Sequence, residues 1–220
     1  MANGNICNKM FHPTNRRKTI TVDENLTFRN HIENIVARAS TRSNLILRCF
    51  VSGDRKSLLK AFTVYVRPII EFDSPVWSPH FQQDIERLES VQRRFTKRLS
   101  GLKDYDYLTR LQILDLETLE MRRLKSDLTL TYKIIFGLVD LNPNDFFSLP
   151  NTDKHTRGHA YRLSTSGATS NVQSQFFSNR ILNVWNNLPA CTTNFSSLNK
   201  FKSSISDDYL VKFCTIKQIS

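Results

Sequence analysis

Apolar side chains recur every three or four positions over much of this chain, which is the spacing of one face of an α-helix. The pattern is clearest over 84–99, where one face carries Ile85, Leu88, Val91, Phe95 and Leu99. At about 100° per residue, the opposite arc carries Arg87, Arg93, Arg94, Lys97 and Arg98. The segment therefore predicts an amphipathic helix with an apolar face on a core and a basic face outside.

Further apolar stripes predict a mainly α fold. One helix is expected from a cap at Thr27 to about Phe50, and a second from Asp54 to Pro68, where the proline ends or kinks it. Other helices are expected at about 105–111 and 117–136, before Pro189, and near the C-terminus around 195–201. The residues expected in the core include Ile32, Phe62, Leu88, Phe95, Leu124, Leu128 and Trp185.

Other segments carry the signals of strands, turns and loops. A short strand is expected at 19–22, which is rich in β-branched residues, and a proline-stiffened connector at 72–79. The polar stretch 151–172 predicts a loop with a weak hairpin about 161–163. His31 lies on an apolar face without a second ligand nearby, so a packed core histidine is favoured over a metal ligand or base. For Trp77, a wedge in the core is favoured over stacking on a base.

The charge balance of the chain favours anionic partners, nucleic acid first. Its 220 residues include 31 Lys and Arg against 20 Asp and Glu, a formal net charge of +11, and its pI is near 9.7. The candidate contacts with a phosphate backbone are Arg87, Arg93, Arg94, Lys97, Arg98, Arg122, Lys125, Arg157 and Arg162. A solvated outer face is the competing interpretation of the basic helix. A flexible surface loop competes for 151–172, where His155 and His159 are further possible phosphate contacts.

The sequence gives no sign of metal, disulfide or membrane chemistry. The four cysteines, Cys7, Cys49, Cys191 and Cys214, are scattered without a Cys-x-x-Cys pair, so neither a disulfide framework nor a zinc site is predicted. We expect no cofactor, and a reduced intracellular setting that is either nucleus or cytoplasm. No apolar run approaches the roughly 20 residues of a membrane span, so no membrane partner is expected.

Several residues in a row resemble a known polymerase family. They are Arg67-Pro68, Glu71-Phe72, Val76-Trp77-Ser78-Pro79, Leu88-Glu89 and Val91-Gln92-Arg93-Arg94-Phe95-Thr96-Lys97-Arg98. This series is similar to the region after the palm in reverse transcriptases of jockey-like non-LTR retrotransposons. The resemblance covers about 19–209 and includes the C-terminal series Phe176-Phe177-x-x-Arg180-x-x-Asn183-x-Trp185-Asn186-x-Leu188-Pro189.

The resemblance implies a helical thumb-like bundle followed by a smaller helical C-terminal region with a long polar loop. The expected divisions are a polar tail at 1–18, a palm-end strand and thumb-like helices at 19–100, a helical connection at 101–150, the polar loop at 151–172 and a C-terminal helical segment at 173–220. As a piece of a larger enzyme, the chain is also expected to expose apolar surface near Phe28 and Ile35, where a palm would pack.

The resemblance also implies that the catalytic groups lie elsewhere. Such a polymerase needs palm carboxylates that hold two metal ions, and the family's Tyr-x-Asp-Asp turn would lie upstream of Asp23. The chain lacks that turn, and its one Asp-Asp pair, Asp207-Asp208, follows Ile205-Ser206 near the C-terminus. We therefore expect no enzyme activity from this chain by itself, with Mg²⁺ needed only in the intact parent polymerase.

The expected function is that of a truncated retrotransposon reverse transcriptase, an RNA-directed DNA polymerase fragment without its palm. Its basic helices would contact template-primer nucleic acid along the backbone without reading sequence, and the palm of a reverse transcriptase is a second expected partner. Two alternatives remain open: a basic helical protein-interaction domain, and a transposon relic with no selected function. Steep salt dependence would favour phosphate contacts, and weak salt dependence a protein interface.

Overall fold

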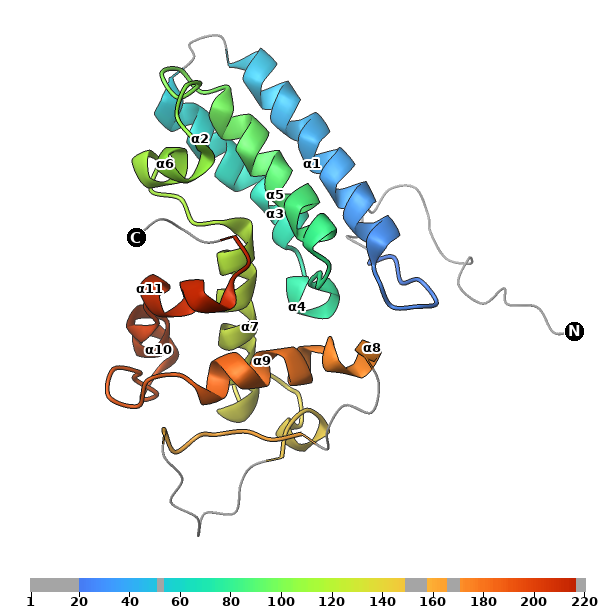
Figure 1. Ribbon diagram of the computed structural model, residues 1–220, viewed down its shortest axis with the longest axis vertical. Helices are drawn as coiled ribbons and strands as arrows, with labels where there is room; N and C mark the ends of the chain where they lie inside the picture. Colours follow the sequence, from blue (N-terminus) through green and yellow to red (C-terminus); the bar gives the residue numbers. More distant parts are fainter. Residues whose placement is uncertain (1–19, 51–53, 149–157, 166–170, 217–220) are drawn as a thin grey trace, which may run out of the picture.

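The computed structural model describes residues 20–50, 54–148, 158–165 and 171–216. Helices dominate these residues, which confirms the predicted mainly α fold class. The described part holds no β-strand; its β pairing is an isolated antiparallel bridge between Ser148 and Ser164. Figure 1 shows two groups of helices, with the long helix α7 leading from the first group into the second.

The first group buries an apolar core that runs from Ile32 to Leu119 along the sequence. Phe62 and Phe95 lie stacked in it, with ring centroids 4.4 Å apart. Trp77 also belongs to this core and is almost fully buried. The helices are α1 (Arg29–Cys49), α2 (Arg55–Tyr65), α3 (Arg67–Glu71), α4 (Ser74–Trp77), α5 (Gln82–Lys97) and α6 (Tyr107–Ile113).

Helices α1 and α5 lie side by side and run parallel (Figure 1). Two cross-helix contacts set their register: Arg87 Nη1 donates to Glu33 Oε1 at 2.6 Å, and Arg98 Nη1 donates to Asn44 Oδ1 at 2.7 Å. Both pairs are separated by 54 residues, so the two helices advance together. This packing holds the basic helix of the sequence analysis firmly against α1.

The second group packs around an aromatic cluster on α7, α9 and α10. Trp185 is fully buried and donates from Nε1 to the carbonyl oxygen of Tyr161 at 2.6 Å. Tyr132 and Phe201 stack at 4.7 Å between ring centroids, and Phe195 lies against both Trp185 and Phe201. The elements are α7 (Leu119–Ile135), η1 (Pro143–Asp145), α8 (Asn171–Ser174), α9 (Phe177–Asn186), α10 (Leu198–Ser204), α11 (Asp207–Leu210) and η2 (Val211–Phe213).

The sequence placed the main helices and most of the core correctly. Six of the seven predicted core residues are no more than 1% exposed, and Leu124 is half-buried against the second core. The predicted end of the second helix near Pro68 is confirmed, because α2 ends at Tyr65 and the proline lies in the first turn of α3. His31 is a packed histidine as expected: Thr21 N donates to its Nδ1 at 3.2 Å, and its ring lies 5.3 Å from that of Trp77.

Several local predictions were wrong. Thr27 does not cap α1; its amide and hydroxyl donate to the Asp23 carboxylate, and Phe28 takes the N-cap position at a φ of 54°. Residues 20–22 of the expected strand have no strand partner, and residue 19 lies outside the described residues. The connector at 72–79 contains the one-turn helix α4. In place of the expected hairpin about 161–163, the described residues show an isolated bridge between Ser148 and Ser164.

Buried polar side chains join the two helix groups. Glu89 on α5 is fully buried and accepts hydrogen bonds from the Leu119 amide at 3.0 and 3.1 Å and from the Tyr107 hydroxyl. Arg180 on α9 donates to both oxygens of Asp127 at 3.0 and 3.1 Å, and to the carbonyl of Pro75 at 2.6 Å. The hydrogen bond from Arg180 to the Pro75 carbonyl connects α9 of the second group to α4 of the first group.

Glu89 should make the stability of the protein depend on pH. Burial raises the pKa of this carboxyl, against the hydrogen bond from Tyr107, which lowers it. The folded state therefore keeps a proton that the unfolded chain loses near pH 4.5, and the stability from this group is lost as pH rises through the raised pKa. Glu89→Gln, which stays neutral, should flatten the decline in stability that begins as pH rises above 4.5 in urea unfolding. Equal slopes in the parent and the variant would show that Glu89 does not titrate in this way.

Candidate nucleic-acid interface

Helix α5 buries one face and presents the other to solvent. Ile85, Leu88, Val91 and Phe95 are buried as the periodicity predicted. The buried arc is wider than the apolar stripe, because Asp84, Glu89, Gln92 and Thr96 are also buried. The helix thus has a broad, fixed contact with the rest of the fold and a narrow basic surface outside.

Two of the candidate cations on α5 have carboxylate partners within the chain. Arg87 lies 2.6 Å from Glu33 on α1 and 3.6 Å from Asp84. Arg93 Nη2 lies 2.9 Å from Glu86 Oε2, and its guanidinium stands 5.0 Å from the ring centroid of Tyr107. Both side chains are partly exposed. A phosphate that binds either arginine would therefore compete with the carboxylate already paired with it.

The other three candidates on α5, Arg94, Lys97 and Arg98, form an exposed basic end of the helix. Arg94 Nη2 donates to Ser90 Oγ at 3.0 Å and Arg98 to Asn44, while Lys97 makes neither a hydrogen bond nor an ion pair within the described residues. No described carboxylate lies within 4.0 Å of any of the three. Their position in and just after the last helical turn also complements the negative end of the helix dipole. Their charges are available to an anion.

A small pocket of about 40 Å³ lies between α1 and α5 beside this basic end. Ser40, Ser43 and Asn44 of α1 line it together with Arg94 and Arg98 of α5. Hydroxyl and amide groups of this kind often contact phosphate oxygens next to arginine. No sequence pattern pointed to the three α1 residues, because their placement depends on the register between two helices.

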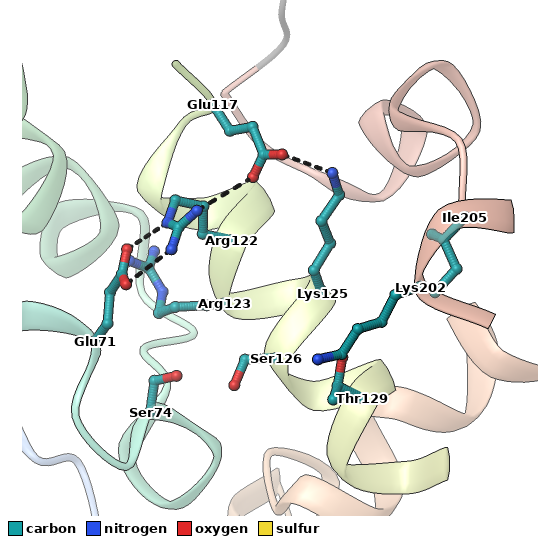
Figure 2. A pocket seen from close by; sticks show the side chains of 10 residues that line it. All are labelled: Glu71, Ser74, Glu117, Arg122, Arg123, Lys125, Ser126, Thr129, Lys202 and Ile205. Carbon is teal, nitrogen blue, oxygen red and sulfur yellow. Dashed lines mark hydrogen bonds and ion pairs between the residues drawn. The ribbon is translucent and has the colours of Figure 1, made fainter. Parts of the chain in front are cut away.

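Arg122 and Lys125 lie apart from the α5 cations, in a pocket between the helix groups (Figure 2). Arg122 donates to both oxygens of Glu71, at 3.0 Å from Nη2, and its Nη1 stands 3.8 Å from Glu117. Hydrogen bonding to Glu71 raises the pKa of Arg122. Lys125 lies 2.7 Å from Glu117 and also pairs with Asp207 on α11. Both cations are held in internal ion pairs.

The polar loop contributes less than its composition suggested. His155 and Arg157 lie outside the described residues, and Arg162 is half-buried. His159 cannot meet phosphate, because it is buried: its Nε2 bonds the Trp185 carbonyl at 2.8 Å and its Nδ1 accepts from the Tyr161 amide at 3.2 Å. Burial lowers the pKa of His159, which favours the neutral ring.

An apolar pocket of about 910 Å³ opens where the two helix groups meet. Phe28, Val76, Phe81 and Phe176 line it, and the last three are 42–51% exposed. Exposed apolar surface was predicted near Phe28 and Ile35. Phe28 does line this pocket, whereas Ile35 is 4% exposed and belongs to the first core.

Among the described residues, no cluster of three or more His, Cys, Asp or Glu side chains is arranged to hold a metal ion. None of the helices in the same residues has the length and apolar character to cross a membrane. In the Asp207-Asp208 pair, Asp207 forms an ion pair with Lys125 and Asp208 is exposed.

Comparison with known proteins gives one informative match. The chain is 26% identical over 121 residues to the uncharacterized protein B0403.1 of Caenorhabditis elegans, across 54% of this chain and 61% of that protein. The matched part thus spans less than two thirds of the relative's length. No family model matches the chain, and no solved structure matches it. The relative's name states no activity.

Proposed function

We propose that this chain binds the backbone of nucleic acid without sequence preference, as the thumb and post-thumb region of a retrotransposon reverse transcriptase would. The observation that carries the proposal is the exposed basic end of α5. Arg94, Lys97 and Arg98 have no carboxylate partner among the described residues, while the opposite face of the helix is buried. The resemblance of 67–98 to that family and the net charge of +11 point the same way.

The geometry suits phosphate in two respects. Arginine presents a planar fork that donates two parallel hydrogen bonds to a phosphate, and its charge persists at any physiological pH. Helix α5 is pinned to α1 through Arg98 and Asn44, so its cations are presented from a rigid support. Such contacts position a duplex without reading its bases, because the phosphates repeat identically along every sequence.

The proposal includes three further expectations. The chain by itself is not a polymerase, and Mg²⁺ would act only in an intact parent enzyme that supplies the palm carboxylates. A reverse-transcriptase palm is an expected partner of the intact protein. The expected location is inside the cell, in the nucleus or the cytoplasm.

The test is a salt titration of duplex binding for the parent and for Arg94→Ala/Lys97→Ala. For the parent, log K should fall with log salt at a slope of about −0.9 for each phosphate contacted. The double variant should bind more weakly on every sequence and lose about two contacts from that slope. Both side chains are exposed, so the variant should keep its fold.

A matched control removes the same charge elsewhere. Lys60 on α2 and Lys200 on α10 are exposed and form no ion pair among the described residues. Lys60→Ala/Lys200→Ala should leave the salt slope close to that of the parent. If both double variants change the slope equally, net charge rather than α5 determines binding. A weak salt dependence in the parent itself would favour the alternative of a protein-interaction domain.

A further inference from the structure

The pocket that holds Arg122 and Lys125 has an unusual surplus of unpaired polar groups. It has a volume of about 420 Å³ and lies between α7, the start of α4 and α10 (Figure 2). Its wall carries four cations and two carboxylates. Arg122 and Lys125 are occupied by Glu71, Glu117 and Asp207, as described above. The other two cations of the pocket wall are Arg123 and Lys202.

Neither remaining cation has a close partner in the described residues. Arg123 is 3% exposed, its Nη1 makes no hydrogen bond, and no described carboxylate oxygen lies within 4.0 Å of it. The carboxylates of Glu89, Glu120 and Asp127 act on it only from longer range. A buried guanidinium without hydrogen bonds is costly, so native proteins usually give it a partner. Lys202 on α10 is exposed and likewise forms no ion pair or hydrogen bond there.

Three hydroxyl groups complete the arrangement. Ser74, Ser126 and Thr129 line the pocket, and the side chain of none of them has a hydrogen-bond partner among the described residues. In Figure 2 the amine of Lys202 reaches towards Ser126 and Thr129, while Arg123 lies on the opposite side with Glu71. In the same view Ser126 stands between the two sides of the pocket, and Ser74 lies below Glu71 on the side of Arg123.

We propose that this pocket binds a small phosphate monoester. A phosphate monoester carries a charge of about −1.5 to −2 and three strong acceptor oxygens, which match two unpaired cations and three unpaired hydroxyls. Arg123 would gain the partner that the protein itself does not supply. The volume lies in the range of small-molecule sites and leaves room beside the phosphate, so the source is either free phosphate or the phosphate of a mononucleotide.

The experiment is isothermal titration of the full chain in phosphate-free buffer with three probes: inorganic phosphate, adenosine 5′-monophosphate and adenosine. Both phosphate-bearing probes should bind and raise the melting temperature, and adenosine should do neither. Tighter binding of the monophosphate than of inorganic phosphate assigns the source to a nucleotide, and equal binding assigns it to free phosphate. No binding by either phosphate probe, or equal binding of adenosine and its monophosphate, would overturn the proposal.

Variants locate the site. Lys202→Gln should weaken phosphate binding about tenfold or more, since it removes one charge-assisted hydrogen bond. Lys200→Gln, on the same helix but outside the pocket lining, should leave it unchanged. Arg123→Met should abolish phosphate binding. Ser126→Ala keeps every charge and should weaken phosphate binding, so it replaces the arginine variant as the test if Arg123→Met does not fold. Equal affinity in Lys202→Gln and the parent would contradict the proposal. Arg94→Ala/Lys97→Ala should still bind phosphate fully, so failure of one proposal is distinguishable from failure of the other.

Discussion

Arg180→Met is expected to lower the free energy of unfolding by about 3–5 kcal/mol. The side chains of Arg180 and Asp127 are 18% and 5% exposed, and Arg180 donates to both carboxylate oxygens of Asp127. Burial raises the pKa of Asp127 and Arg180 opposes that rise, so removing the arginine leaves a buried carboxylate without its partner. The variant also loses the hydrogen bond to the Pro75 carbonyl that ties α9 to α4. Urea unfolding followed by circular dichroism measures the change.

A second variant separates the charge from the packing. Asp127→Leu/Arg180→Met removes both ions together, and should recover much of the lost stability because an apolar pair can replace a buried ion pair. Arg38→Met provides the control, since Arg38 is exposed on α1 and should change stability by less than about 0.5 kcal/mol. If Arg180→Met were as harmless as Arg38→Met, the pair between the helix groups would contribute nothing to stability.

Local periodicity was enough to locate the long helices. The stripe from Ile85 to Leu99 gave α5 within two residues at each end, because a helix face is encoded by spacing alone. Asp54, where the second helix was expected to begin, does cap α2: its carboxylate accepts from the Ser57 amide at 2.8 Å. Thr27 failed as a cap because Asp23, four residues earlier, takes its amide and hydroxyl. Cap residues that compete for one another's donors are hard to rank from sequence.

The candidate site depended on contacts between helices, which no local pattern encodes. Arg87 and Arg94 lie on the same exposed arc of α5, and their sequence pattern does not distinguish them. Only Arg87 pairs with Glu33, because the register between α1 and α5 places that carboxylate beside it, whereas Arg94 donates to Ser90. Arg123 carries no sequence signal at all: it follows Arg122 in a charged run, and its burial appears only when α7 packs between the two groups. The sequence therefore shows which residues are charged, but it does not show which of them are buried or paired with an opposite charge.

Trp185→Ala is expected to destabilise the second helix group by about 3–5 kcal/mol. The indole is fully buried among Phe195, Phe201 and His159 and loses its hydrogen bond to Tyr161 in the variant. The chain has two tryptophans, so the variant keeps Trp77 alone, and that residue is buried in the first core. Its fluorescence then reports on the helix group that the substitution does not touch.

The expected result is that the Trp77 signal and the helical circular dichroism of Trp185→Ala share one urea midpoint, shifted well below that of the parent. The contact of Arg180 with Pro75 crosses between the groups, and Glu89 holds the first residue of α7, the helix that continues into the second core, so damage to the second core should spread to the first. Tyr105→Ala, at an exposed aromatic residue, is the control and should leave the midpoint nearly unchanged. If the Trp77 midpoint stayed at the parent value while half of the helical signal was lost early, the two groups would be independent folding units. The buried polar contacts between them would then be too weak to couple their unfolding.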